Sequence, residues 1–234
     1  MGSHVSDTAG EVELVVVDDA DAAAETAAQR IAEAVDAGGQ IGLSGGSGPR
    51  PTYERLAVLR PDWSRVHLWW VDERCVPPAD GDSNYRLIRE SLLDGLARGP
   101  EVHRVRGELA PEEAAAEYDA ALAGVTLDLA VMGIGPDGHT ASLFPNAPTL
   151  DETERRAVAA EAGFEPFVPR VTMTRPVLAA ARALIFLVTG DRKAEAVERA
   201  FAQPPSPATP ASLVRGRRTT AILDRAAASR LPGQ

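Results

Sequence analysis

The chain has 234 residues, 44% of them hydrophobic and 25% charged, which is typical of a globular protein with a sizeable core. Its formal net charge of −10 argues against a nucleic-acid or membrane-surface partner, and no apolar run reaches the length of a membrane span. The single cysteine, Cys75, excludes an internal disulfide and fits a reducing cytoplasm. We therefore expect a cytoplasmic protein that folds as one domain over residues 11–234, preceded by a tag remnant and flexible N-terminus in residues 1–10.

The first half of the chain alternates apolar runs with segments of helical spacing. The apolar runs predict strands over residues 11–17, 40–43 and 66–71. The segments of helical spacing predict three helices. The first begins after Asp18-Asp19 and ends near Ala37, the second covers residues 50–60 with Pro51 near its start, and the third begins after Ser83-Asn84 and ends at Leu96. Gly38-Gly39 ends the first of these helices, and a polar loop through Asp82 follows the third strand.

The second half continues the alternation. The apolar or β-prone runs predict strands over residues 104–105, 127–132, 170–174, 183–189 and 219–223. The helical patterns cover residues 111–123, 175–181, 194–201 and 224–231, while residues 145–167 are less regular and 203–210 form a loop. This order predicts a mostly parallel sheet with helices on both faces, with room for a small additional lobe around residues 145–180.

A glycine-rich stretch, Gly133–His139, follows one of the predicted buried strands. We expect Thr140–Leu143 to open a helix after it. The end of a strand, a glycine turn and a helix start are where open α/β sheets bind ligands, and such a helix start favours anions. His139 can exchange a proton near neutral pH, and Asp137 can orient its ring. The stretch therefore predicts the catalytic loop of a hydrolase that acts on a phosphorylated substrate.

Two glycine-rich segments resemble nucleotide-binding motifs but differ from them at defining positions. Gly133–Gly138 matches G-x-G-x-x-G, but it lies in mid-chain, contains Pro136 and lacks an acidic residue at the end of a following strand, so we reject a dinucleotide site. Ser44–Gly48 lacks the Gly-Lys-Ser/Thr ending of a P-loop. It is compatible both with a plain tight turn and with a phosphate-binding group of backbone N–H donors.

Charged and metal-binding side chains leave several interpretations open. Arg74 can bind phosphate or form an internal ion pair with Asp72 or Glu73. Lys193, the one lysine beside 23 arginines, is either a mobile point charge for an anion or an ordinary surface residue. His67 alternates within a predicted strand and is expected to be a packed or edge residue, and His103 lies in a basic surface patch, residues 103–106. No His, Cys or carboxylate spacing is typical of a zinc site.

Five blocks, in order along nearly the whole chain, resemble the glucosamine-6-phosphate isomerase/6-phosphogluconolactonase family. They are residues 43–47, residues 71–77 with 83–85, residues 133–145, residues 170–174 and residues 190–193. The resemblance implies a fold like that of the glucosamine-6-phosphate deaminases and catalysis without a metal or organic cofactor. It also implies hydrolysis of 6-phospho-D-glucono-1,5-lactone to 6-phosphogluconate, in the oxidative pentose phosphate pathway.

The resemblance also implies roles for particular residues. His139 would be the general base, with Asp137 and Asp72 beside it. The residues that would hold the phosphate and sugar oxygens are Ser44, Gly45, Gly46, Ser47, Arg74, Asn84, Arg170 and Lys193. We expect a phosphorylated sugar lactone as the partner molecule, and a monomer or weak homodimer.

Two other functions are compatible with parts of the chain. Glucosamine-6-phosphate deaminases share the G-x-G-x-D-G-H core, but they carry a glutamate shortly after the histidine where this chain has Phe144, and a phenyl ring cannot relay a proton. A non-catalytic sugar-phosphate sensor would need only the binding loops. The Asp137-Gly138-His139 sequence argues against it, because a sensor needs no base.

Overall fold

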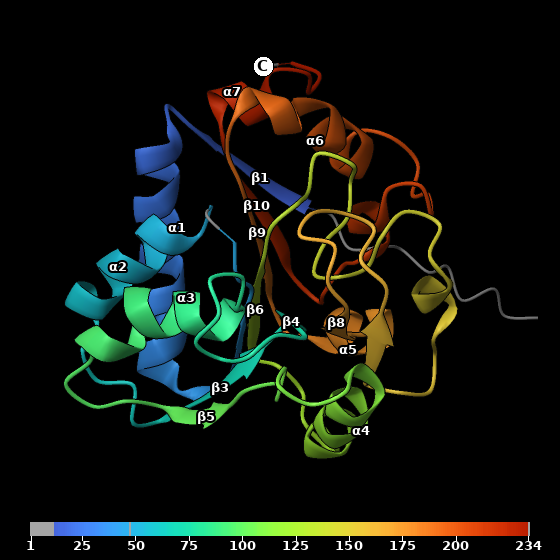
Figure 1. Ribbon diagram of the computed structural model, residues 1–234. Coiled ribbons are helices and arrows are strands. Elements are labelled where there is room, and N and C mark those ends of the chain that lie inside the picture. The colour runs from blue at the N-terminus through green and yellow to red at the C-terminus, as the bar shows by residue number, and fades with distance from the viewer. Residues whose placement is uncertain (1–11, 47, 234) are drawn as a thin grey trace, which may run out of the picture.

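Seven parallel strands form the central sheet of the computed structural model, which describes residues 12–46 and 48–233 (Figure 1). The order across the sheet is β1-β10-β9-β6-β2-β3-β5. The strands are β1 (Val12–Val17), β2 (Gly39–Leu43), β3 (Val66–Trp70), β5 (Glu101–His103), β6 (Leu129–Met132), β9 (Leu184–Val188) and β10 (Thr219–Asp224). The predicted mostly parallel α/β fold is confirmed. The tag expected in residues 1–10 and the site residue Ser47 lie outside the described residues.

A second, antiparallel sheet of three strands lies beside the first. Its order is β4 (Asp72–Arg74), β8 (Arg170–Met173) and β7 (Ala157–Ala160). The chain passes from β3 of the central sheet into β4 at Val71, whose carbonyl accepts a hydrogen bond from the Met173 N–H at 2.9 Å. Strands β7 and β8 fall within residues 145–180, where the sequence left room for a smaller lobe.

The helices cover both sides of the central sheet. They are α1 (Ala20–Ala37), α2 (Arg50–Leu59), α3 (Asn84–Ser91), α4 (Pro111–Ala121), α5 (Arg175–Ala180), α6 (Ala194–Phe201) and α7 (Arg225–Ala228). Figure 1 shows α1, α2 and α3 on one side of the sheet, and the second sheet with α4 and α5 on the other. Short 3₁₀ turns occur at Leu93–Gly95, Pro148–Asp151, Asp191–Lys193 and Pro210–Leu213. Among the described residues, no helix combines the length and the apolar composition that a membrane crossing requires.

The capping residues predicted from the sequence begin the first helices as expected. Asp19 accepts a hydrogen bond from the Ala22 N–H, and Ser83 accepts one from the Arg86 N–H. Gly38, with φ of 77°, ends α1 in a conformation that favours glycine. In the core, the Tyr118 hydroxyl donates to the Trp70 carbonyl and accepts from the Trp70 N–H, which fixes the end of β3 just before the site residue Asp72.

The helix expected at Thr140–Leu143 does not form, and this prediction is wrong. The four residues make a tight turn in which Thr140 and Leu143 pair with each other and Ala141 has φ of 51°. Ser142, fully buried, donates through its hydroxyl to Asp72 and through its N–H to Thr172 of the second sheet. These tertiary hydrogen bonds replace the ones a helix would have offered.

Two further boundaries differ from prediction. The short strand is β5 at residues 101–103 rather than 104–105, because Val105 is buried in the core and Arg104 pairs with Glu108. The helices predicted to end at Leu96 and Leu231 end at Ser91 and Ala228. Residues 72–74, expected at the end of the third strand, form the separate strand β4, and β7 lies in the region predicted to be irregular.

Candidate active site

A cleft of about 250 Å³ opens where β2, β6 and β9 of the central sheet end, next to the second sheet. The predicted site residues that line it are Ser44, Gly45, Gly46, Asp72, Arg74, Asn84, His139, Arg170 and Lys193. Asp137 does not line the cleft but contacts His139 directly. The carboxyl ends of parallel strands meet at one edge of a sheet, which explains why residues so far apart in sequence meet here.

The His139 side chain is held from one side by Asp137. The Asp137 Oδ1 atom lies 2.6 Å from His139 Nδ1 and also accepts the His139 backbone N–H at 3.1 Å. Burial acts to raise the pKa of Asp137, but the hydrogen bond and charge of His139 outweigh it and lower that pKa below its ordinary value. An ionised Asp137 accepts the Nδ1 proton, so the tautomer assigned from this contact leaves Nε2 as a proton acceptor. No described residue is hydrogen-bonded to Nε2.

The loop that carries His139 depends on glycine at position 135. A Cβ atom there would overlap the His139 ring and crowd the Asp137 carboxylate. The Gly135 N–H also donates to the His139 carbonyl at 2.9 Å, which closes the turn. Gly135 therefore allows the close approach that forms the Asp137–His139 pair.

Two phenyl rings enclose the imidazole. Phe144 lies 5.1 Å and Phe164 lies 5.5 Å from the His139 ring, centroid to centroid, and both line the cleft. Phe144 is 4% exposed, so the position that carries a glutamate in the deaminase pattern is here part of an apolar wall. The rings limit the access of water to the histidine and fix its orientation.

Two arginines lie opposite each other on neighbouring strands of the second sheet. Arg74 of β4 pairs in register with Arg170 of β8, and neither forms an ion pair with a described residue. The Arg74 guanidinium donates to the Asp82 carbonyl, and Arg170 donates to the carbonyls of Phe164, Pro166 and Val168. Burial lowers the pKa of Arg170, and the charge of Arg74 lowers it further, while Asp72 acts in the opposite direction.

Like charges placed directly opposite on neighbouring strands are destabilising. The internal ion pair with Asp72 or Glu73, which the sequence left open for Arg74, does not occur. The arrangement therefore holds positive charge that an anion in the cleft would neutralise.

Lys193 adds a third cation to the cleft. Burial lowers its pKa, Arg192 lowers it further, and Asp224 acts in the opposite direction. The Asp224 carboxylate is already engaged by the N–H groups of Gly190 and Ala227, and Lys193 Nζ pairs with no described residue. A half-buried ammonium without a partner favours an anionic ligand over the surface-residue interpretation.

Several buried polar atoms along the cleft wall also have no hydrogen-bond partner. They are Ser44 Oγ, Arg74 Nε and Asn84 Oδ1. Buried polar groups in native proteins are normally satisfied, so these three atoms have hydrogen-bonding capacity that the described residues leave unused. Asn84 fits this position because residue 45 is glycine: a Cβ there would overlap the Asn84 amide.

Asp72 is fixed by neighbours other than His139. Its carboxylate accepts from the Ser142 hydroxyl at 2.6 Å and from the Asn84 amide at 3.3 Å. Of the two aspartates predicted beside the histidine, only Asp137 contacts it. Asp72 lines the cleft at 6% exposure, in a position to contact a bound ligand.

The sequence did not reveal three residues that support the site. Glu73, 2% exposed, accepts the backbone N–H groups of Arg74, Asn84 and Tyr85, each at 2.7 Å. Burial raises its pKa to about 7 against these hydrogen bonds. Ser142, which holds Asp72, and Phe164, which lines the cleft, were also missed, because only tertiary contacts place them there and no local pattern marks them.

The cleft offers no cluster of three metal ligands. Among the described residues, the one group of this kind is His67, Glu101 and His103, which belongs to β3 and β5 and does not line the cleft. The sequence treated the two histidines as unrelated packed or surface residues, but the structure brings them together.

Comparison with known proteins gives one consistent result. The family described as glucosamine-6-phosphate isomerases/6-phosphogluconolactonase matches residues 18–223. A 6-phosphogluconolactonase of Streptomyces coelicolor is 37% identical, over 94% of this chain and 95% of the relative. The crystal structure of a 6-phosphogluconolactonase from Thermotoga maritima is 31% identical, with a TM-score of 0.80 over 92% of this chain and 100% of that one. A monomeric glucosamine-6-phosphate deaminase, at 20% identity and a TM-score of 0.83, shares the fold.

Proposed function

Because the chain belongs to the glucosamine-6-phosphate isomerase/6-phosphogluconolactonase family, we propose that it hydrolyses 6-phospho-D-glucono-1,5-lactone to 6-phosphogluconate, with His139 as the general base. The observation that carries this proposal is the pairing of an Asp137-oriented histidine with unneutralised cations in one cleft. The first supplies a proton acceptor, and the second supplies a binding site for a phosphate.

The chemistry needs little beyond an oriented base. A δ-lactone is an activated ester, so a water molecule has to lose a proton as it attacks the carbonyl carbon. His139 Nε2 takes this proton, and Asp137 stabilises the imidazolium that forms. The proton then passes to the ring oxygen as the C–O bond breaks, which yields the open-chain acid. The N–H groups of the Ser44–Gly46 loop or a guanidinium stabilise the tetrahedral oxyanion.

The phosphate positions the ring for this reaction. Arg74, Arg170 and Lys193 hold the phosphate, while Ser44 and Asn84, which line the cleft, bind sugar oxygens. The free energy of phosphate binding orients the carbonyl group, which lies far from the charged end of the substrate. The local cluster of cations also offsets the unfavourable field of a chain with a net charge of −10.

Phe144 favours lactone hydrolysis over deamination. The ring packs against His139 in an apolar wall, where it can neither accept nor donate a proton. A deaminase-type isomerisation would need a further proton-transfer group at this position. Release of ammonia from glucosamine 6-phosphate at a rate comparable to lactone hydrolysis would overturn this choice.

The test measures acid release from 6-phosphogluconolactone at constant pH, with spontaneous hydrolysis subtracted. We expect His139→Ala to lower kcat by about 10²–10⁴-fold with KM nearly unchanged, which is the range typical of a lost general base. His103→Ala, a histidine outside the cleft, serves as the matched control and should retain wild-type turnover. Normal turnover by His139→Ala would refute the assignment of the base.

Further properties belong to the same proposal. The enzyme acts in the oxidative pentose phosphate pathway of the cytoplasm, as a single catalytic domain over residues 11–234. It needs neither a metal nor an organic cofactor for this reaction. It is a monomer or weak homodimer and binds no nucleic acid. Sedimentation at several protein concentrations tests the oligomeric state, and a stable tetramer would contradict it.

A further inference from the structure

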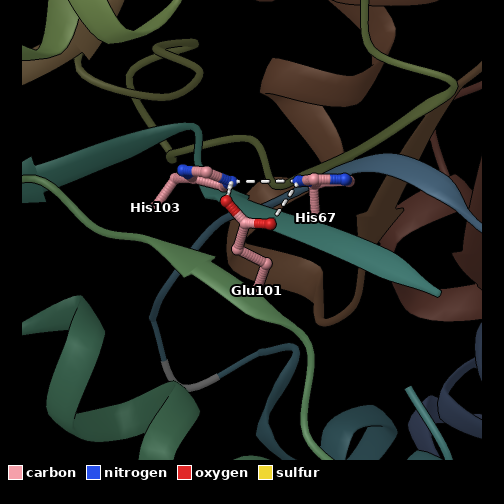
Figure 2. Close-up of side chains that lie close together, drawn as sticks. All are labelled: His67, Glu101 and His103. Atoms are coloured by element: carbon pink, nitrogen blue, oxygen red, sulfur yellow. Dashed lines mark hydrogen bonds and ion pairs between the residues drawn. The ribbon is translucent and has the colours of Figure 1, made fainter. Parts of the chain in front are cut away.

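The edge of the central sheet carries a second group of chemically competent side chains, away from the cleft. His67 lies on β3, and Glu101 and His103 lie on β5, the edge strand (Figure 2). The register pairs His67 with Glu101 and Trp69 with His103. Residues two apart on a strand share a face, so the sheet places all four side chains on the same side.

The three polar groups converge on one point. His67 Nδ1 lies 3.2 Å from His103 Nε2, and these nitrogens lie 3.4 and 3.3 Å from the two oxygens of Glu101. Figure 2 shows the two rings facing each other through these nitrogens, with the carboxylate reaching both. Ligand atoms about 2.0–2.1 Å from a tetrahedral zinc ion are about 3.3–3.4 Å apart, so the nitrogen–nitrogen separation of 3.2 Å is close to one edge of a zinc coordination tetrahedron. The two nitrogens contact different oxygens of Glu101, and this exposed carboxylate supplies the third ligand atom by turning one oxygen toward an ion bound to both rings.

From this geometry we propose that His67, Glu101 and His103 bind a divalent transition metal ion of the zinc class at the sheet edge. Two imidazoles and one carboxylate form a ligand set suited to zinc and its neighbours, whereas magnesium and calcium prefer oxygen ligands alone. The remaining coordination position faces solvent, because the side chains of His67 and Glu101 are 40% and 64% exposed. The ion would join the edge strand β5 to β3.

The surroundings prepare the ligands for a metal. The Trp69 ring stacks on His103 at 4.1 Å, with an angle of 9° between the planes, and Trp69 is itself fixed by a hydrogen bond to Gln40. This stack holds the His103 ring in place before an ion arrives.

The site is separate from the proposed lactonase cleft. His67 lies five residues before Asp72, roughly 16 Å of extended chain. None of the three ligands lines the cleft. Metal binding and lactone hydrolysis can therefore be lost independently, and neither proposal depends on the other.

The experiment is a calorimetric titration of the full chain with ZnCl₂. We expect one saturable site per chain with a Kd of the order of micromolar. His67→Ala, Glu101→Gln and His103→Ala should each weaken binding at least tenfold, while His139→Ala and His4→Ala, the two other histidines, should leave Kd unchanged. Glu101→Gln is the safest variant for the fold because this side chain is mostly exposed.

Two further readouts identify the site. Co²⁺ in place of Zn²⁺ should give the visible absorption of a tetrahedral complex, absent in Glu101→Gln, and Zn²⁺ should slow amide hydrogen exchange in β5. The proposal is overturned if no saturable binding occurs below about 1 mM. It is equally overturned if Kd is unchanged in all three ligand variants, or if His139→Ala alone removes the binding.

Discussion

The hydrogen bond between Asp137 and His139 allows a quantitative prediction. The variant Asp137→Asn keeps the size of the side chain but removes the charge that accepts the Nδ1 proton at 2.6 Å. Hydrogen bonds to charged groups contribute about 1.5–3 kcal/mol, and this stabilisation grows as the imidazole becomes charged in the transition state. Since about 1.4 kcal/mol corresponds to a tenfold change in rate, we expect kcat to fall about 10–150-fold.

The effect should be confined to turnover. Asp137 does not line the cleft, so KM should stay within about twofold of the wild-type value. Initial rates of acid release at constant pH, corrected for spontaneous hydrolysis, measure both constants. Asp151→Asn, an exposed aspartate outside the cleft, provides the matched control. A kcat within twofold of wild type, or a loss expressed only in KM, would refute the role assigned to Asp137.

Three other predictions concern the cations and the buried acid beneath them. Arg74→Met should raise KM at least tenfold, because a hydrogen bond to a charged group contributes about 1.5–3 kcal/mol. An unchanged KM in steady-state kinetics would exclude Arg74 from phosphate binding. Lys193→Ala should raise KM with little change in kcat. Because burial lowers the pKa of Lys193 in the free protein, the wild-type KM should also rise with pH before an ordinary lysine would deprotonate. Glu73, with a pKa raised from 4.5 to about 7, contributes stability that is complete below pH 4.5 and is lost as the pH rises through 7. Denaturant unfolding from pH 4.5 to 8 should show this loss of about 3 kcal/mol, and Glu73→Gln should lack it.

The cleft proposed as the active site was predictable because its residues follow strand ends. Ser44 and Asp72 come directly after apolar runs that the sequence identifies as strands, and His139 follows another such run after the Gly133–Gly138 loop. Parallel strands bring such positions together. Their detailed contacts were not predictable. Ser142 lies in a turn rather than a helix because it hydrogen-bonds to Asp72 and Thr172. These partners are distant in the sequence, so the turn could not be predicted. The absence of an ion pair at Arg74 likewise depends on its pairing with Arg170 across the second sheet.

The metal-ligand cluster at the sheet edge could not be found from spacing. His67 and His103 are separated by 36 residues, and only the register of β3 with β5 makes them neighbours. The sequence placed the short strand at residues 104–105, which would have left His103 outside it. The error of a few residues in the predicted position of β5 was therefore enough to hide the cluster from a sequence-based prediction.

The residues of the proposed site come from two separate sheets. His139 stands on a loop that follows β6 of the central sheet, whereas Arg74 and Arg170 stand on the second sheet. Lys193 follows β9 of the central sheet, so the three cations proposed to hold the phosphate are themselves shared between the two sheets. A ligand that contacts all three cations and His139 therefore connects the sheets. A lactone without a phosphate would leave both arginines of the second sheet uncontacted, and should be discriminated against in kcat as well as in KM.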